Sequence, residues 1–577
     1  MNTTKGTVTG VNGNMVAVEI AGPVMQNEVA MIHRDGVVLQ SEIVRITGNV
    51  AAVQVFEDTR DLRVGDPVDF TGRLLSVQLG PGLLGQIYDG LQNPLPRIAE
   101  EAGFFLPPGS MAEGLDGERR WRFTPTVEAG DVVTAGSAIG TVPEGIFDHA
   151  IMVPFDLEGD ATVLSIAGPG EYAVADPVAR IREEGGRERE LKLAFYWPVK
   201  RPIRAYADRL APREPLVTGV RIIDTFFPVA RGGTFCIPGP FGAGKTVLQH
   251  IISRHADVDV VIVAACGERA GEVVELLREF PELEDPRTGR SLMERTIIIC
   301  NTSSMPVAAR EASIYTAATL GEYYRQMGLN VLLLADSTSR WAQAMREASG
   351  RLEEIPGEEA FPAYLESRIA EFYERAGRVV LPDGRSGSLT IGGTVSPAGG
   401  NFEEPVTQAT LKVVGAFLGL SRERANARRF PSIDPLESWS KYPGIIDGER
   451  VRLGRTLLAR GDSVRQMMMV LGESGISAAD FEAFLKSELL DRVYLQQNAF
   501  DAVDAATAPD RQERVYAMLC RVLAAELSGE DREATRARFN RLQQLFLDWN
   551  YLAMADAAFA EREAEIAEVV GAPPPPA

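Results

Sequence analysis

The stretch GPFGAGKT at residues 239–246 constrains the fold of this chain most strongly, because it fits G-x-x-x-x-G-K-[ST] between a strand pattern and a helix pattern. The apolar run TFCI (234–237) before it predicts a strand. The one-sided apolar spacing of KTVLQHIISRH (245–255), with Val247 in the stripe, predicts a helix. The alternative is a chance glycine-rich turn, which this context disfavours. The stretch therefore predicts a phosphate-binding loop in a parallel α/β sheet.

The residue types of this loop suit the phosphates of a nucleotide such as ATP or ADP. Gly242 and Gly244 allow the backbone to curl around phosphate oxygens, and the amides up to Val247 point at them from a helix N-terminus. Lys245 is expected to reach the β- and γ-phosphates, and Thr246 to offer its hydroxyl to Mg²⁺. The predicted nucleotide-binding residues of the loop are Gly239, Pro240, Phe241, Gly242, Ala243, Gly244, Lys245, Thr246 and Val247.

A second apolar run, NVLLLAD, predicts a strand that ends in Asp336, 91 residues after Lys245. A carboxylate at the end of a strand beside the phosphate loop is where Mg²⁺ and its waters need an anion, so Asp336 is the second predicted metal ligand. The alternative is an N-cap for the helix that DSTSRW begins. Arg340 follows four residues later and could face the phosphates, with a surface salt bridge as the alternative.

The run VIVAACGERAG (261–271) raises a question, because a buried strand pattern ends in the oppositely charged pair Glu268-Arg269. A solvated loop is one explanation. Strands of one parallel sheet end at the same edge, however, so this strand can deliver its end to the γ-phosphate. The pair then predicts a carboxylate for the attacking water and a guanidinium for the phosphate.

The pattern of strand-like and helix-like segments along the chain predicts a multidomain α/β protein. Alternating strands around an Asn12-Gly13 turn predict an N-terminal β-barrel over 1–75. The other expected parts are a linker region at 76–109, a β-sandwich-like insert at 110–190, a RecA-like nucleotide domain at 191–435 and a helical domain at 436–577 that ends in a proline-rich tail. The insert resembles biotinyl and lipoyl carriers in rhythm, but DHAIMVPFD offers no carrier lysine, so we expect a structural role.

The composition of the chain argues against several classes of partner and site. The net charge of −21 argues against a nucleic-acid partner, so any anion site must be built locally. The four cysteines have neither zinc-ligand nor CxxC spacing, which predicts buried thiols, and the four histidines form no metal motif. The sequence lacks a signal-peptide core and an apolar run long enough for a membrane span, so we expect a cytoplasmic protein that reaches a membrane only through partners.

Several long motifs resemble those of the catalytic A subunits of V-type and A-type rotary ATPases. They are GPFGAGKT, GERAGEVVELLREFPEL, NTSSMPVAAREASIYTAATLGEYYR, ADSTSRWAQAMRE, AYLESRIAEFYERAGRV and FPSIDPLESWSKY, and the likeness extends from the barrel to the C-terminal helices. The resemblance implies ATP hydrolysis or synthesis coupled to proton or sodium transport. It implies an A3B3 ring with non-catalytic B subunits, which supply an arginine finger in trans. The stretch RERANARRF of this chain also offers candidate arginines, Arg422, Arg424, Arg428 and Arg429, but the family's source is the neighbouring B subunit. It also implies central rotor and peripheral stalk subunits and a membrane sector, with this chain on the cytoplasmic side.

The resemblance also implies roles for individual residues. Glu268 matches the catalytic glutamate and Arg269 an arginine that contacts the terminal phosphate, while Arg340 falls at an arginine near the phosphates. Phe430 falls where the family places a ring against adenine, and Phe500 is a second candidate; core packing is the alternative for both.

This chain departs from the family pattern at two places. Ala243 stands where eukaryotic members carry a cysteine, so thiol-based regulation at that point should be absent. Ala270-Gly271-Glu272-Val273 replaces the common G-N-E-M, which leaves the hydrogen bonds around Arg269 open.

Three other functions are alternatives to that of the catalytic subunit. A non-catalytic ring subunit would be expected to lack Glu268 or Lys245, both of which are present. A Rho-type nucleic-acid motor would need basic and aromatic strand-tracking surfaces, which the acidic composition does not favour. Secretion and flagellar export ATPases are shorter and lack the insert.

Overall fold

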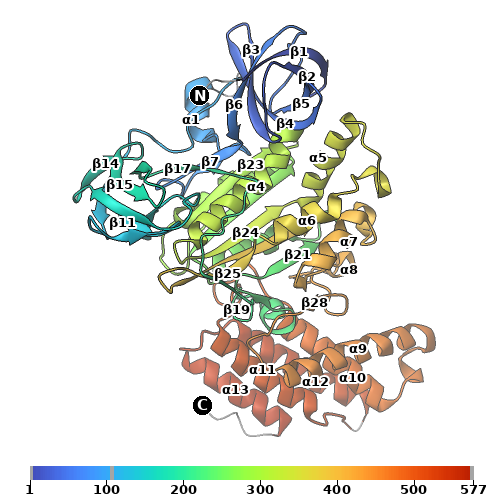
Figure 1. Cartoon of the computed structure of the whole chain (residues 1–577). Coiled ribbons are helices and arrows are strands. Elements are labelled where there is room, and N and C mark those ends of the chain that lie inside the picture. Colours follow the sequence, from blue (N-terminus) through green and yellow to red (C-terminus); the bar gives the residue numbers. More distant parts are fainter. Residues whose placement is uncertain (1–3, 104–108, 304, 530, 572–577) are drawn as a thin grey trace. The chain divides into compact units, whose positions relative to one another are not determined.

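The computed structural model describes residues 4–103, 109–303, 305–529 and 531–571 in two compact units (Figure 1). The first unit contains Met1–Ala211, Val258–Val395 and Glu403–Val413, and the second contains Pro212–Asp257, Ser396–Phe402 and Val414–Ala577. The phosphate loop thus belongs to the second unit, whereas Glu268 and Asp336 belong to the first. From residue 572 on, the predicted proline-rich tail lies outside the described residues.

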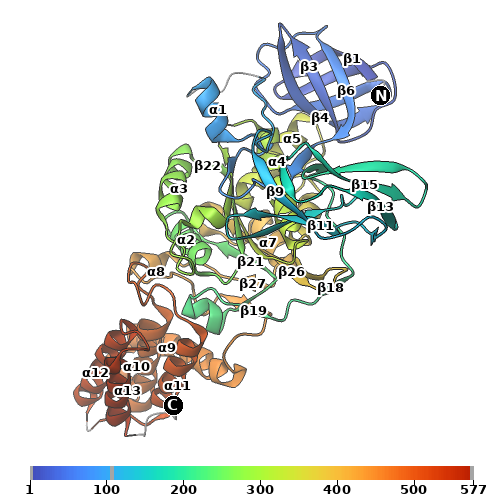
Figure 2. The ribbon, with the colours of Figure 1, turned by 90° about the vertical axis from the view of Figure 1, so that its left-hand side faces the viewer.

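A closed six-stranded barrel begins the first unit, as predicted (Figure 2). Its strands pair in the order β1-β2-β5-β4-β3-β6, with β1 Thr4–Asn12, β2 Met15–Ile20, β3 Glu28–Arg34, β4 Val37–Thr47, β5 Val50–Val55 and β6 Pro67–Leu74. Alternate apolar side chains fill its interior. The predicted Asn12-Gly13 turn was wrong by one residue: Asn12 still pairs with Met15, and the turn is Gly13-Asn14, with φ of 60° at Gly13.

The insert is a sandwich of two four-stranded sheets. One has the order β10-β13-β15-β16 and the other β12-β11-β9-β14. The strands are β9 Arg120–Pro125, β10 Val132–Val133, β11 Ala138–Glu144, β12 Phe147–Met152, β13 Ala161–Ile166, β14 Gly170–Ala173, β15 Pro177–Glu183 and β16 Glu188–Lys192. The strand before the insert pairs with the strand after it: β7 Ser76–Leu79 is antiparallel to β17 Phe195–Pro198. The two ends of the insert therefore lie side by side.

The stretch compared with a carrier hairpin is buried rather than exposed. His149 on β12 is fully buried, and its Nδ1 and Nε2 lie 2.5 Å from Glu144 Oε2 and 2.8 Å from the Tyr323 hydroxyl. Tyr323 belongs to α4 (Val307–Arg325), so this chain of polar contacts ties the insert to the parallel sheet that α4 covers. The burial supports the structural role expected for the insert.

Parallel strands form the sheet of the first unit in the order β26-β24-β22-β23-β8. They are β8 Ile87–Tyr88, β22 Val260–Glu268, β23 Thr296–Thr302, β24 Asn330–Asp336 and β26 Ser386–Val395. An antiparallel edge is added by β25 Gly377–Val380 and β18 Asp208–Leu210. The helices around it are α1 Leu95–Ala102, α3 Ala270–Glu282, α5 Thr338–Arg351, α6 Leu365–Tyr373 and α7 Pro405–Val413.

The second unit joins a few short strands to a helical domain. β21 Thr234–Pro238 runs parallel to β27 Ala416–Phe417, which pairs with β28 Trp439–Ser440, while β19 Pro215–Leu216 pairs with β20 Val229–Ala230. Its helices are α2 Lys245–His255, α8 Arg422–Asn426, α9 Gly448–Leu471, α10 Ala478–Leu490, α11 Pro509–Ala524, α12 Arg532–Asn550 and α13 Ala557–Val570. Across the described ranges, none of the helices is long and apolar enough to cross a membrane. The four cysteines are buried, as expected.

Candidate active site

The predicted phosphate loop joins β21 to α2 in the second unit, as the sequence pattern requires. Gly242 and Gly244 have φ of 77° and 89°, in the left-handed region that glycine adopts without strain. A Cβ at either position would meet no atom within 4 Å, so backbone conformation rather than crowding explains these two glycines. The loop therefore has the backbone shape from which amides can surround an anion.

Two side chains of the loop are placed for phosphate and metal chemistry. Lys245 Nζ donates hydrogen bonds to the carbonyls of Gly239 (2.7 Å) and Pro240 (3.3 Å), which holds the ammonium over the loop. Thr246 is exposed in the first turn of α2. Both side chains are thus available to a ligand at the helix N-terminus, in line with their predicted roles.

A cavity of about 430 Å³ lies beside the loop and contains both predicted aromatic residues. Phe430 and Phe500 line it together with Val247 and Arg428. Phe500 is 95% exposed, so the core-packing alternative is wrong for this residue. Val247 was expected in the buried stripe of α2 but is 40% exposed and faces this cavity instead. The cavity offers two flat rings and an apolar side chain within the second unit, as a base-binding pocket would.

Glu268 and Asp336 end two paired strands of the first unit. Ala265 of β22 pairs with Asp336 of β24, which brings Glu268 to the same edge of the sheet. Asp336 Oδ1 accepts a hydrogen bond of 2.5 Å from the Thr394 hydroxyl on β26. The solvated-loop explanation of Glu268 is wrong, because this residue is the half-buried end of strand β22, at the carboxyl edge of a parallel sheet.

The surroundings of Glu268 raise its pKa to about 7. Burial is the main cause, followed by the negative charge of Asp336 and the neighbouring Glu272, while the polar side chain of Ser337 acts in the opposite direction. A carboxyl group with a pKa near neutral can accept and release a proton at working pH. The arrangement is therefore suited to acid–base work.

The two predicted arginines flank this edge. Arg269 is exposed and directly precedes α3, which begins at Ala270. Arg340 donates a hydrogen bond of 3.1 Å from Nη1 to Gln343 Oε1 on the next turn of α5. A Cβ built on Gly267 would lie 3.0 Å from Arg340 Cβ, so the start of α5 packs against the strand that carries Glu268.

The candidate metal ligands are oxygen donors. Thr246 contributes a hydroxyl and Asp336 a carboxylate, the ligand types that Mg²⁺ prefers. No group of three or more His, Cys, Asp or Glu residues that could hold a metal is found in the part of the chain that the structure describes. Each side chain offers an oxygen of the kind that holds an ion bound through few protein oxygens together with phosphate.

Sequence reasoning missed four residues that support the site. Gly267 forms a bulge before Glu268, Glu272 and Ser337 influence the pKa of Glu268, and Ser432 contacts the phosphate loop. Glu272 is the one of the four whose contact is local in sequence, because it lies in the first turn of α3, four residues after Glu268. The other contacts depend on sheet pairing or on distant parts of the chain.

Comparison with known protein families divides the chain into consecutive matches. The ATP synthase alpha/beta family matches with its β-barrel domain at residues 8–72, its barrel-sandwich domain at 112–200 and its nucleotide-binding domain at 219–440. The C-terminal domain of V and A type ATP synthase matches residues 453–534. These assignments support the predicted order of barrel, sandwich insert, nucleotide domain and helical domain.

Curated relatives match over nearly the whole chain. The V-type ATP synthase alpha chain 1 of Treponema pallidum is 63% identical over 566 residues, which cover 98% of this chain and 96% of the relative. The V-type ATP synthase alpha chain of Treponema denticola is 61% identical, with the same coverage of both chains. That of Borrelia hermsii is 59% identical, and the match covers 98% of each chain.

Proposed function

The chain belongs to the family of V-type ATP synthase alpha chains, and we propose that it is the subunit in which ATP is hydrolysed or synthesised, in a rotary complex that couples this reaction to ion transport. The observation that carries the proposal is the position of Glu268, at the carboxyl edge of the sheet with its pKa raised to about 7. A subunit that only bound nucleotide would not need a proton acceptor poised there.

Different residues have different roles in the hydrolytic step. Glu268 orients a water molecule and accepts its proton as the water oxygen bonds to the γ-phosphorus and the bond to the β–γ bridging oxygen breaks. Lys245, Arg269 and Arg340 stabilise negative charge on the phosphates, and the amides of the loop bind the same anion. Synthesis is the reverse, with Glu268 returning the proton.

Mg²⁺ fits the proposal, with Thr246 and Asp336 as the residues that would hold it. When bound, the ion would neutralise charge on the phosphate oxygens. The Thr394 hydroxyl that binds Asp336 Oδ1 fixes the direction of this carboxylate.

Phe430 and Phe500 would bind the adenine base in the cavity that they share with Val247. Stacking between a base and an aromatic side chain contributes about 1–3 kcal/mol in nucleic-acid complexes. The Phe430 carbonyl accepts a hydrogen bond of 2.8 Å from the Gln497 amide, and Phe430 lies two residues before Ser432, which binds the phosphate loop. Phe430 is therefore the better-supported platform.

We also propose the wider assembly. Three copies of this chain would alternate with three non-catalytic B subunits around a central rotor, with peripheral stalks and a membrane sector, so that the chain lies on the cytoplasmic side. Among the nearby arginines of this chain, Arg424 and Arg429 are bound by Asp491. That pairing favours a B subunit as the source of the arginine finger.

The variant Glu268→Gln tests the catalytic role in the assembled complex. We expect ATP affinity within about threefold of wild type and a fall of roughly 10²–10⁴-fold in kcat, the range found for general acid–base groups. Glu275→Gln is the matched control, because Glu275 is an exposed residue of α3, the helix that follows Glu268. Wild-type turnover by Glu268→Gln would remove Glu268 from the mechanism.

A second measurement tests the finger. The purified chain should bind ATP yet hydrolyse it far more slowly than the chain combined with its B partner, because transition-state charge lacks the partner's arginine. Equal rates with and without the partner would contradict the supply of this group in trans.

A further inference from the structure

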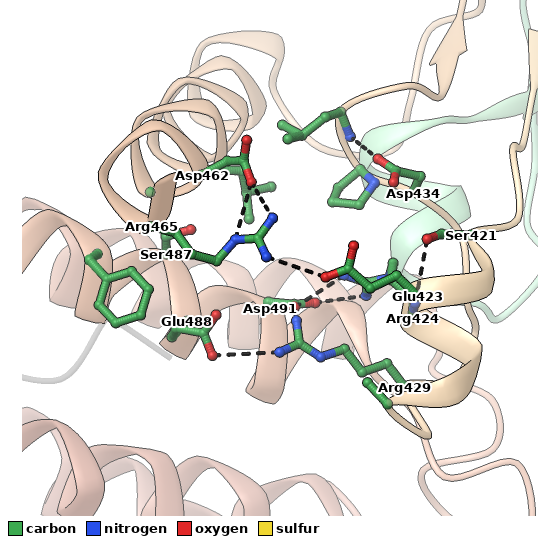
Figure 3. Close-up of a pocket in the computed structure, with 16 residues that line it drawn as sticks. Ser421, Glu423, Arg424, Arg429, Asp434, Asp462, Arg465, Ser487, Glu488 and Asp491 are labelled. Carbon is green, nitrogen blue, oxygen red and sulfur yellow. Dashed lines mark hydrogen bonds and ion pairs between the residues drawn. The ribbon is translucent and has the colours of Figure 1, made fainter. Parts of the chain in front are cut away.

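One buried carboxylate, Asp491, binds two arginines, of which Arg429 immediately precedes the proposed base platform Phe430 and Arg424 lies six residues before it (Figure 3). Arg424 Nη2 and Nη1 donate to its two oxygens at 2.7 and 3.1 Å, and Arg429 Nη1 donates to Oδ2. The Asp491 side chain is 6% exposed. Two guanidinium groups on one desolvated carboxylate make a stiff junction, because charge-assisted hydrogen bonds from two side chains fix its orientation.

This junction of Asp491, Arg424 and Arg429 is connected directly to Phe430, because Arg429 precedes Phe430 in the chain. The Arg429 amide donates a hydrogen bond of 2.9 Å to the Arg424 carbonyl, so both arginines are fixed to each other as well as to Asp491. Glu488 lies 3.6 Å from Arg429 Nη2 and adds a second acidic partner from α10. On the other side of Phe430, Ser432 binds the phosphate loop.

The segment that begins at Asp491 also leads to the second ring. The carbonyls of Tyr494 and Gln496 accept hydrogen bonds from the buried Arg221 side chain. The Gln497 amide donates 2.8 Å to the Phe430 carbonyl, and Phe500 follows three residues later. Both rings of the cavity are therefore attached to one short stretch of chain whose first residue is Asp491.

We propose that Asp491 is a positioning residue for nucleotide binding, which acts through Arg429 to hold Phe430 against the adenine base. The inference rests on the proposed function, because it assumes that Phe430 stacks on the base. It predicts that weakening the junction lowers affinity for the base and leaves affinity for the phosphates unchanged.

The test compares Arg429→Gln with wild type in the full chain and in the assembled complex. Arg429 is 27% exposed, and its loss leaves Asp491 paired with Arg424, so this variant should fold where an Asp491 change could fail. We expect Kd for ATP to rise about three- to tenfold, the Kd for inorganic tripolyphosphate to stay the same, and KM rather than kcat to change. Arg465→Gln is the control, because Arg465 pairs with Asp462 and Glu423 and lines the same pocket as Arg429 and Asp491, the pocket drawn in Figure 3.

Phe430→Leu distinguishes the role of Phe430 in binding the base from the role of Asp491 in positioning Phe430. If this variant loses ATP affinity by about 5- to 100-fold while Arg429→Gln binds ATP normally, the positioning proposal is wrong and the base platform stands. If Phe430→Leu binds ATP normally, the base platform itself is wrong. In support of the proposal, the double variant should bind ATP no more weakly than Phe430→Leu alone. Equal losses for ATP and tripolyphosphate in Arg429→Gln would indicate a general disturbance and overturn it.

Discussion

The Ser432 hydroxyl donates a hydrogen bond of 2.5 Å to the carbonyl of Ala243, across 189 residues of sequence. Ser432 is 4% exposed, so both groups lose water when the bond forms. The contact fixes the end of the Phe430 segment to the middle of the phosphate loop. Base pocket and phosphate pocket are therefore joined by one buried hydrogen bond within the second unit.

Ser432→Ala should weaken ATP binding and lower stability. The change removes the donor and leaves the Ala243 carbonyl buried without this partner, which costs about 1–3 kcal/mol. We expect a loss of a few degrees in the melting temperature and an increase in Kd for ATP of several fold, measured by calorimetry on the full chain. Ser463→Ala, which removes a hydroxyl on an exposed face of α9, should change neither value. Unchanged ATP affinity in Ser432→Ala would show that the two pockets are held together by other contacts.

Gly267→Ala should damage the catalytic edge. Gly267 has φ of 76°, and an added Cβ would lie 2.7 Å from Arg310 Cδ and 3.0 Å from Arg340 Cβ. Left-handed backbone and crowding together should cost about 1–3 kcal/mol and rotate Glu268 at the bulge. We expect at least a tenfold fall in ATPase rate and a lower melting temperature.

Gly271→Ala is the matched control for this change. It lies four residues further on in α3, has no atom within 4 Å of an added Cβ, and needs no positive φ. Alanine there should be neutral or stabilise by up to about 1 kcal/mol. A large loss in Gly271→Ala would show that the departure from the family pattern at Ala270-Gly271 affects function.

Glu272→Gln should change the pH dependence of the reaction. Glu268 works as a base only when ionised, so kcat/KM, which reports the free enzyme, should rise as the pH passes through about 7. Because Glu272 contributes to the raised pKa of Glu268, its neutralisation should move this rise to lower pH. Glu275→Gln provides the comparison, and superimposable pH profiles for all three proteins would exclude a role of Glu272 in tuning the base.

The parts of the site that the sequence predicted depend on short-range patterns. The phosphate loop is read from eight consecutive residues, and Glu268 and Asp336 from apolar runs that stop abruptly at an acid. In each case the residue lies where a strand ends, and the end of the strand places its side chain at the edge of the sheet. The same local logic predicted the barrel, the insert and the buried cysteines.

The parts that were missed depend on tertiary contacts. Val247 has the spacing of a buried residue, yet it faces a cavity formed with residues from the C-terminal region. Arg424 and Arg429 could have been fingers from sequence alone, and only Asp491, more than 60 positions away, shows that they are engaged within the chain. A hairpin turn slipped by one residue because Gly13, rather than Asn12, takes the first turn position.

Glu268→Gln should also stabilise the nucleotide-free chain, and the gain should grow with pH. The folded-state pKa of Glu268 is raised from 4.5 to about 7, so the folded protein retains a proton that the unfolded chain has released. Stability is therefore lost as the pH rises from about 4.5 to 7, with a total of up to about 3 kcal/mol. Glutamine removes this titration. The melting temperature of the variant should match wild type near pH 5 and exceed it by several degrees at pH 8, in scans without nucleotide and Mg²⁺. Glu275→Gln should show no such trend, and a difference for Glu268→Gln that is constant between pH 5 and 8 would mean that Glu268 titrates normally in the folded chain.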